Sequence, residues 1–176
     1  MRLIRLTNRE MKEISFKNDV LPLKDKLFRL ALRITLNREE AEDIVQDTLI
    51  KLWNQRDEWS AIQNMETYSM TICRNLSLDA IEKKERLNIS LDETVHDRPD
   101  NSQTQDEELM KQQQLNTVMH IIGQLPEKQR TIMQLRDIEG KSYQEIADIM
   151  SINVSDVKVN LFRARQKVVG SINKES

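Results

Sequence analysis

Residues 142–168 are predicted to form two short helices joined by a tight turn. Ser142 can cap the first helix, and Glu145 three residues later completes a capping box. Residues 151–153 interrupt the apolar pattern, and Asn153 can cap a second helix. Apolar residues at spacings of three and four indicate one buried stripe in that helix, made of Val154, Val157, Leu161, Ala164 and Val168. A polar outer face on the second helix is typical of a DNA-binding helix-turn-helix, although the pattern alone fits an ordinary helical hairpin equally well.

The remainder of the 176 residues also favours helices. The chain contains three Gly and three Pro, and its apolar residues recur mostly at spacings of three and four. This composition predicts an all-α fold and disfavours a β-sandwich or barrel. The net charge of −2 is low for a protein that binds DNA through phosphate contacts alone. Any DNA binding is therefore expected to need a larger, basic partner.

The sequence offers few groups for enzymatic or metal chemistry. The single cysteine, Cys73, excludes an internal disulfide, and His96 and His120 have no neighbours at metal-ligand spacing. The sequence shows no paired-carboxylate pattern, phosphate-binding glycine loop or nucleophile beside a histidine. We therefore expect no enzymatic activity, metal, cofactor or small-molecule substrate. Without a signal peptide or an apolar run of about eighteen residues, the chain is expected to be soluble and cytoplasmic.

A long amphipathic helix is predicted to begin near residue 38, just after Asn37. Its apolar stripe consists of Ala41, Ile44, Val45, Leu49, Leu52 and Trp53. The opposite face is charged, and in most helices such a face is simply covered by water. Ile50 on this face, and Gln46 among acidic neighbours, nevertheless indicate a docking surface.

A third helix is predicted from about residue 66 to residue 86, after an irregular segment that contains Trp59. An exposed Trp59 beside Arg74 and Asn75 could stack on single-stranded bases while the polar side chains bond to base edges. The alternative, which the sequence alone slightly favours, is that Trp59 covers the hydrophobic core. Cys73 is expected to be a small core residue without chemistry.

Residues 87–110 are predicted to be a flexible, acidic linker. The segment SLDETVHDRPDNSQTQDEE is polar and cannot bury enough apolar surface to become ordered. The chain would then consist of a lead-in (1–19), a helical domain (20–86), the linker, and a second helical domain (111–170). Four helices are expected in the second domain, and the last two form the helix-turn-helix.

Two motifs resemble those of one protein family. The segment DIVQDTLIKLWNQR resembles the core-polymerase-binding part of region two in extracytoplasmic-function (ECF) sigma factors. The segment LPEKQRTIMQLRDIEGKSYQEIADIMSINVSDVKVNLFRARQKV resembles their promoter-binding region four. The resemblance covers about residues 20–170 and implies a subunit of bacterial RNA polymerase that directs promoter-specific initiation, with core RNA polymerase and promoter DNA as partners. It also suggests an anti-sigma factor, which in this family is often membrane-bound.

The resemblance implies roles for individual residues as well. Contact with core polymerase, through its β′ coiled coil and β flap, is expected to involve Asp43, Ile44, Gln46, Asp47, Ile50 and Lys51. Capture of the melted minus-ten strand is expected to involve Trp59, Tyr68, Thr71, Arg74 and Asn75. Binding of the duplex minus-thirty-five element is expected to involve Ser142, Tyr143, Ser155, Asp156, Lys158, Val159, Asn160, Arg163 and Arg165.

Several positions depart from the family pattern. Ser151 occupies the place of the usual turn glycine, which raises the cost of a left-handed conformation there. Asp156, Val159 and Asn160 lower the expected phosphate affinity of the second helix, and Thr71 replaces a common Arg in the minus-ten helix. Two alternatives therefore stay open: a free-standing helix-turn-helix regulator, and an interaction module that has lost promoter recognition.

Overall fold

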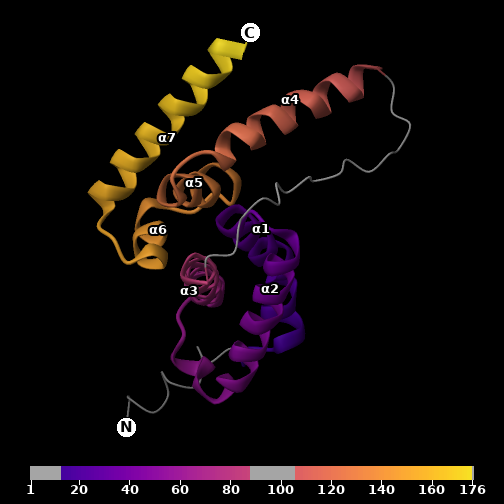
Figure 1. Ribbon diagram of the computed structural model, residues 1–176. Coiled ribbons are helices and arrows are strands. Elements are labelled where there is room, and N and C mark those ends of the chain that lie inside the picture. The colour runs from indigo at the N-terminus through magenta and orange to yellow at the C-terminus, as the bar shows by residue number, and fades with distance from the viewer. Residues whose placement is uncertain (1–12, 88–105, 176) are drawn as a thin grey trace.

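The computed structural model describes residues 13–87 and 106–175, and its regular elements in these ranges are all helical (Figure 1). The all-α prediction is therefore confirmed. In chain order the helices are η1 (Phe16–Val20), η2 (Leu21–Leu23), α1 (Lys24–Thr35), α2 (Arg38–Asn54), η3 (Arg56–Ala61), α3 (Met65–Arg86), α4 (Asp106–Gly123), α5 (Glu127–Met133), η4 (Gln134–Ile138), α6 (Tyr143–Met150) and α7 (Val154–Glu175). No helix within the described ranges is long and apolar enough to cross a lipid bilayer.

Helices α1, α2 and α3 pack against one another and form the first domain (Figure 1). Leu36 takes a left-handed conformation (φ 56°) directly after α1. The Asn37 side chain then accepts a hydrogen bond from the Glu40 N–H at 3.0 Å and caps α2. This reversal and cap turn α2 back against α1. Most of the predicted α2 stripe is buried, namely Ala41, Ile44, Val45 and Leu52.

Helices α6 and α7 form the predicted helix-turn-helix. Ser142 Oγ accepts from the Glu145 N–H at 3.1 Å, and Glu145 Oε2 accepts from the Ser142 N–H at 2.8 Å, which confirms the capping box. Ser151 has a φ of 55°, so the turn uses the left-handed conformation that costs more without glycine. Asn153 Oδ1 accepts from the Asp156 N–H at 2.8 Å and caps α7. The inward stripe of α7 is buried at Val157, Leu161, Ala164 and Val168.

The two domains share one hydrophobic core, an arrangement that the sequence left open. Helix α3 packs against α6, and α1 packs against α5 (Figure 1). The first domain contributes Leu27, Leu30, Ile34, Met70 and Cys73, and the second contributes Ile132, Leu135, Ile146, Ile149 and Met150. Three helices alone would leave much of this apolar surface in water. Burial against the second domain removes that cost.

Some predicted boundaries differ from the structure. Helix α4 begins at Asp106, inside the segment expected to be linker (87–110), and residues 88–105 of that segment lie outside the described residues. Residues 1–12 of the expected lead-in (1–19) also lie outside them. Phe16, however, begins the π-helical turn η1 and stacks on Trp59 with ring centroids 6.5 Å apart. The end of the lead-in therefore belongs to the first domain.

Candidate functional site

The outer face of α2 is open to solvent at most of the predicted docking residues. The exposed members are Asp43, Gln46, Asp47, Ile50 and Lys51. Ile50 is 53% exposed among these polar side chains. Ile44 differs from this expectation: it is 6% exposed and packs in the core, because it belongs to the apolar stripe. Its side chain is not part of the outer face.

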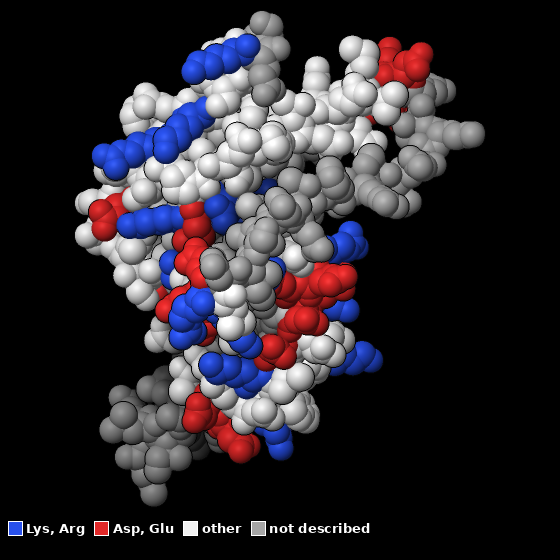
Figure 2. Space-filling model, viewed as in Figure 1, with Lys and Arg blue, Asp and Glu red and all other residues white. Residues whose placement is uncertain are grey.

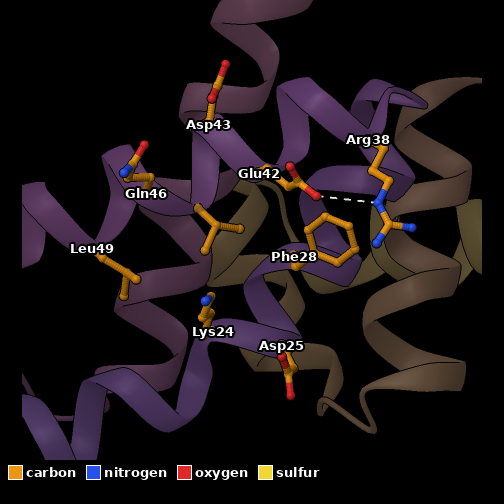
Figure 3. Close-up of a pocket in the computed structure, with 9 residues that line it drawn as sticks. Lys24, Asp25, Phe28, Arg38, Glu42, Asp43, Gln46 and Leu49 are labelled. Carbon is orange, nitrogen blue, oxygen red and sulfur yellow. Dashed lines mark hydrogen bonds and ion pairs between the residues drawn. The ribbon is translucent and has the colours of Figure 1, made fainter.

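A hollow of about 640 Å³ lies between α1 and α2 (Figure 3). Its lining residues are Lys24, Asp25, Phe28, Arg38, Glu42, Asp43, Val45, Gln46 and Leu49. The Arg38 guanidinium lies 5.8 Å from the centroid of the Phe28 ring, and Arg38 Nε donates to Glu42 Oε1 at 3.4 Å. The hollow therefore combines an aromatic wall with charges of both signs around it.

A second hollow, of about 390 Å³, continues the first along α2, because Gln46 and Leu49 line both. Its other lining residues are apolar: Phe16, Ile50 and Trp53. Trp53 is 47% exposed, although the sequence placed it in the buried stripe, and its ring lies 5.4 Å from that of Phe16. Sequence reasoning missed both aromatic residues. We call the two hollows together the α2 groove.

Charges of opposite sign lie over different helices. In Figure 2, acidic side chains gather over α2 and basic side chains gather along α7. The exposed acids of α2 include Glu39, Glu42, Asp43 and Asp47. This separation fits two different partners, a basic one at α2 and an acidic one at α7.

Trp59 is buried in the first domain. Its side chain is 6% exposed and packs with Val20, Leu52 and Ile72. Its indole N–H donates to the Leu52 carbonyl oxygen at 2.9 Å, which satisfies the polar atom that a buried tryptophan must pair. An exposed stacking platform at Trp59, which the family resemblance implied, is therefore not observed, and Trp59 covers the core, as the sequence alone slightly favoured.

The other minus-ten candidates lie along α3 with different exposure. The Tyr68 hydroxyl donates to Gln55 Oε1 at 2.6 Å, and the Thr71 hydroxyl donates to the Thr67 carbonyl oxygen at 2.9 Å. Both side chains are half-buried, whereas Asn75 is exposed. Of these residues, Asn75 is the one most accessible to a base.

Arg74 is half-buried, and its Nε lacks a hydrogen-bond partner within the described part of the chain. It lies one helical turn after Met70 and one turn before Leu78, and both of these pack in the core shared with α6. Arg74 therefore lies on the side of α3 that faces the second domain. Leaving a buried donor unpaired is costly, so this side chain would gain by meeting an acceptor.

The outer face of α7 is exposed, as a DNA-reading helix requires. The predicted residues on it are Ser155, Asp156, Lys158, Val159 and Arg163. Asn160 is half-buried, and its side-chain amide donates to the Asp156 carbonyl oxygen at 2.8 Å. Phe162 was not predicted, yet it is 62% exposed and lies three residues after Val159 on the same side of the helix. An aromatic residue outside the buried stripe was the signal that could have identified it.

Residues of η4 and of the start of α6 contact the side of α7. The Tyr143 ring contacts two cations, with Arg136 Cζ 4.5 Å and Lys158 Nζ 5.5 Å from its centroid. Arg165 Nε donates to Asp137 Oδ2 at 3.1 Å, and this bond raises the pKa of the Arg165 guanidinium. Arg165 thus joins α7 to η4 here, and a phosphate would have to share or replace Asp137.

Cys73 belongs to the core. Its Sγ donates to the Leu27 carbonyl oxygen at 3.4 Å, and burial raises the pKa of the thiol to about 12. The thiol is therefore protonated at neutral pH. Within residues 13–87 and 106–175, no group of three or more His, Cys, Asp or Glu side chains could hold a metal ion.

Comparisons with known proteins match both domains. The model of Sigma-70 region 2 matches residues 20–87, and that of Sigma-70 region 4 matches residues 115–168. The ECF RNA polymerase sigma factor SigW of Bacillus subtilis is 30% identical over 152 residues, which cover 81% of each chain. SigE of Mycolicibacterium smegmatis, another ECF sigma factor, is 27% identical over 153 residues, 86% of this chain and 59% of that protein. This chain belongs to the ECF family of RNA polymerase sigma factors.

Solved structures agree over both domains. The sigma factor RpoE from Bartonella quintana, in complex with the anti-sigma factor NepR, matches with a TM-score of 0.76 and 25% identity over 90% of this chain and 96% of that one. CnrH, in complex with the cytosolic domain of CnrY, shares the fold with a TM-score of 0.66. As an ECF sigma factor the protein directs promoter-specific initiation by RNA polymerase and is not an enzyme. Membership of this family excludes the alternative that the chain is a free-standing helix-turn-helix regulator.

Proposed function

We propose that this sigma factor uses three surfaces during initiation. The α2 groove binds the β′ coiled coil of core polymerase, α3 captures the melted minus-ten strand, and the outer face of α7 reads the duplex minus-thirty-five element. Residues 20–86 would then serve polymerase and the minus-ten element, residues 111–170 the minus-thirty-five element, and residues 87–110 would connect them. The α2 groove is the observation that carries this proposal.

The chemistry of the α2 groove fits a helical partner that is partly apolar and partly basic. Ile50 and Trp53 offer exposed apolar surface at its centre. Asp43 and Asp47 flank that surface with negative charge. Apolar contacts would supply affinity, while the carboxylates would orient a partner rich in Lys and Arg. Such a surface is unusual for a helix face that only meets water.

Minus-ten capture would depend on α3 itself more than on Trp59, because the indole is buried. Asn75 can bond to the edge of an unpaired base, and Arg74 can bind a backbone phosphate. Tyr68 can contribute an aromatic face if its hydroxyl releases Gln55. Extrusion and capture of bases would draw the duplex open without covalent chemistry.

The minus-thirty-five contact would combine apolar and basic side chains on α7. Val159 and Phe162 can contact thymine methyl groups in the major groove. Lys158 and Arg163 can bind phosphates and fix the register of the helix. Asn160 is an unfavourable base reader here, because its amide already bonds to the Asp156 carbonyl.

The partners follow from these surfaces. The second domain would also contact the β flap of core polymerase, and the protein would act in the cytoplasm, where polymerase and promoter DNA are found. The similar sigma factor RpoE was solved in complex with the anti-sigma factor NepR, and CnrH in complex with the cytosolic domain of CnrY. An anti-sigma factor of this protein, membrane-bound or not, would inhibit it by covering the α2 groove.

Replacing Ile50 by Asp is expected to weaken binding of the full chain to a β′ coiled-coil fragment by about 10- to 100-fold. The reason is the loss of about 1.5–3 kcal/mol of apolar burial at the centre of the groove. Isothermal titration calorimetry with purified fragment would measure it. Val169→Asp is the matched control, because Val169 is 56% exposed near the far end of α7 and the same change there should leave binding intact. Equal affinities of the Ile50→Asp variant and the wild type would exclude the groove as the docking site.

Replacing Arg163 and Arg165 together by Ala is expected to lower run-off transcription by about tenfold or more, because the phosphate contact of Arg163 is lost together with the Arg165–Asp137 bond that joins α7 to η4. Core polymerase and genomic promoter fragments would provide the assay, and polymerase binding should be unchanged. Lys174→Ala, an exposed cation in the last turn of α7, serves as the control. Normal transcription from the double variant would instead favour the interaction module that has lost promoter recognition.

A further inference from the structure

The apolar end of the α2 groove lies beside the point where the described chain begins. Phe16 lines this end of the groove together with Ile50 and Trp53. The described residues start at Glu13, only three positions before Phe16. A trans peptide chain advances at most about 3.8 Å per residue, so Glu13 lies within about 11 Å of Phe16. The residues that precede Glu13 are therefore attached at the edge of the groove.

The chain is anchored to the first domain at this point. Ile14 and Phe16 pack against the buried cluster around Trp59. The Ser15 N–H donates to Asp19 Oδ2 at 2.8 Å, which ties the start of η1 to its own end. A segment linked to one end of a surface meets that surface at a high effective concentration, which is in the millimolar range for short linkers. Weak contacts are then enough to hold the segment there.

The twelve residues before Glu13, which we call the N-terminal arm, lie outside the described ranges. Their sequence, MRLIRLTNREMK, has the pattern of a basic amphipathic helix. At 3.6 residues per turn the apolar and the basic side chains fall on two separate arcs of a helix surface. The apolar arc would contain Leu3, Ile4, Leu6 and Met11, and the basic arc Arg2, Arg5, Arg9 and Lys12. With these four basic residues and one acidic residue, Glu10, the arm carries a net charge of +3.

The outer face of α2 carries the opposite charge. Its exposed side chains include two bases, Arg38 and Lys51, and four acids, Glu39, Glu42, Asp43 and Asp47, which gives a net charge of −2. Two of these acids, Glu42 and Asp43, line the larger hollow of the groove (Figure 3). Exposed apolar surface at Ile50 and Trp53 lies farther along the same helix. The groove thus offers an apolar strip with acidic neighbours, which complements an apolar arc with basic neighbours.

The arm and the groove also agree in length. From Trp53 to Asp43 helix α2 spans ten residue steps, or about 15 Å. A helix of twelve residues is about 18 Å long. An arm that leaves the chain beside Phe16 and runs along α2 would therefore reach from Trp53 to Asp43. Its apolar arc would cover Ile50 and Trp53, and its Arg side chains would come near Asp47 and Asp43.

We propose that the N-terminal arm binds the α2 groove of the free protein and competes there with core polymerase. The arm offers the groove the same chemistry as the partly apolar, partly basic partner helix. This inference rests on the proposed function, because it takes the groove as the docking site of the β′ coiled coil. It adds that the chain carries its own competitor, which polymerase has to displace before it docks.

A spin label on the arm tests the contact in the full chain. Asn8→Cys provides the attachment point, because the single native cysteine, Cys73, is buried and its thiol has a pKa raised to about 12. Position 8 lies between the two arcs, so the label should not block the contact. In NMR spectra the label is expected to broaden amide signals of α2 as far as Asp43. Adding Arg5→Glu and Arg9→Glu should restrict the broadening to residues next to η1.

Competition is measured by titrating the full chain with the β′ coiled-coil fragment in a calorimeter. Arg5→Glu combined with Arg9→Glu is expected to bind the fragment about 3- to 10-fold more tightly than the wild type, because an arm that covers the groove in about 70–90% of molecules lowers the apparent affinity by that factor. The matched control is Lys111→Glu combined with Lys174→Glu. These exposed residues of α4 and α7 do not line the groove, and the net charge changes equally. The control should bind like the wild type.

Leu3→Ser combined with Leu6→Ser keeps every charge and should also tighten binding, which separates release of the arm from attraction of a basic fragment to added carboxylates. Unchanged or weaker binding by both arm variants would overturn the proposal. Broadening confined to residues next to η1 in the chain labelled at position 8 would overturn it too, and binding of that chain to phosphatidylserine vesicles would then assign the arm to a lipid surface. Failure of the fragment to bind any variant would refute the docking proposal, while the label would still decide whether the arm covers α2.

Discussion

The Trp59→Ala variant is expected to lose about 3–5 kcal/mol of folding stability. The side chain is 6% exposed, packs against Phe16 and Leu52, and donates its indole N–H to the Leu52 carbonyl. Truncation would leave a large cavity between η1, the end of α2 and η3. A domain of this size has only about 5–15 kcal/mol in total, so the loss is a large fraction. Urea unfolding followed by circular dichroism would measure it.

Trp53 offers a matched control within the same aromatic cluster. Its side chain is 47% exposed and lines the α2 groove, so Trp53→Ala should cost little stability and weaken binding of the β′ coiled-coil fragment. Trp59→Ala should therefore mainly lower folding stability, whereas Trp53→Ala should mainly lower affinity for the fragment. If Trp59→Ala were as stable as the wild type yet failed to open promoters, Trp59 would act by stacking on bases and not as a core residue.

The helix-turn-helix was predictable because its determinants are local. The capping box of Ser142 and Glu145 and the cap from Asn153 each join residues three positions apart. Such bonds depend on nearby backbone and little else, so the sequence is enough to identify them. The same holds for Asn37 at the start of α2.

Closure of the two domains was not predictable from the same patterns. Periodicity shows that Leu27, Met70 and Ile146 are buried, but it does not show that they meet in one core. The contacts that align the domains join residues far apart in sequence, such as Arg29 with Glu139. In a sequence with many charged residues, neither residue of such a pair indicates which distant residue it will contact.

The solvent exposure of a residue at the edge of an apolar stripe depends on tertiary neighbours, and the spacing of apolar residues in the sequence does not identify them. Trp53 and Trp59 are both aromatic and lie six positions apart, yet one is half-exposed and the other buried. Both rings contact Phe16 of η1, but only Trp59 also packs in the buried cluster of Val20, Leu52 and Ile72. The charged outer faces of α2 and α7 were easier to predict, because solvation of such residues needs no particular neighbour.

Replacing Arg130 by Met is expected to lower the free energy of unfolding by roughly 2–4 kcal/mol. The substitution removes the donors to the carbonyl oxygens of Arg33, Ile34 and Leu125, at 2.7, 2.7 and 2.8 Å. An unsatisfied buried carbonyl costs about 1–3 kcal/mol. Removing the guanidinium also removes the cost of burying its charge, which partly offsets the loss of these hydrogen bonds. Burial lowers the pKa of the Arg130 guanidinium, as expected when a buried charge is costly.

Arg130→Lys tests whether the positive charge alone stabilises the protein or whether the planar guanidinium with its several N–H donors is needed. A lysine keeps the cation at the end of α1 but has one nitrogen on a flexible stem, so it cannot hold all three carbonyls in the same way. We expect it to recover part of the lost stability in urea unfolding. Lys111→Met, an exposed cation on α4, should leave stability unchanged. If Arg130→Met matched Lys111→Met, the cap across the two domains would contribute nothing, and apolar packing alone would hold them together.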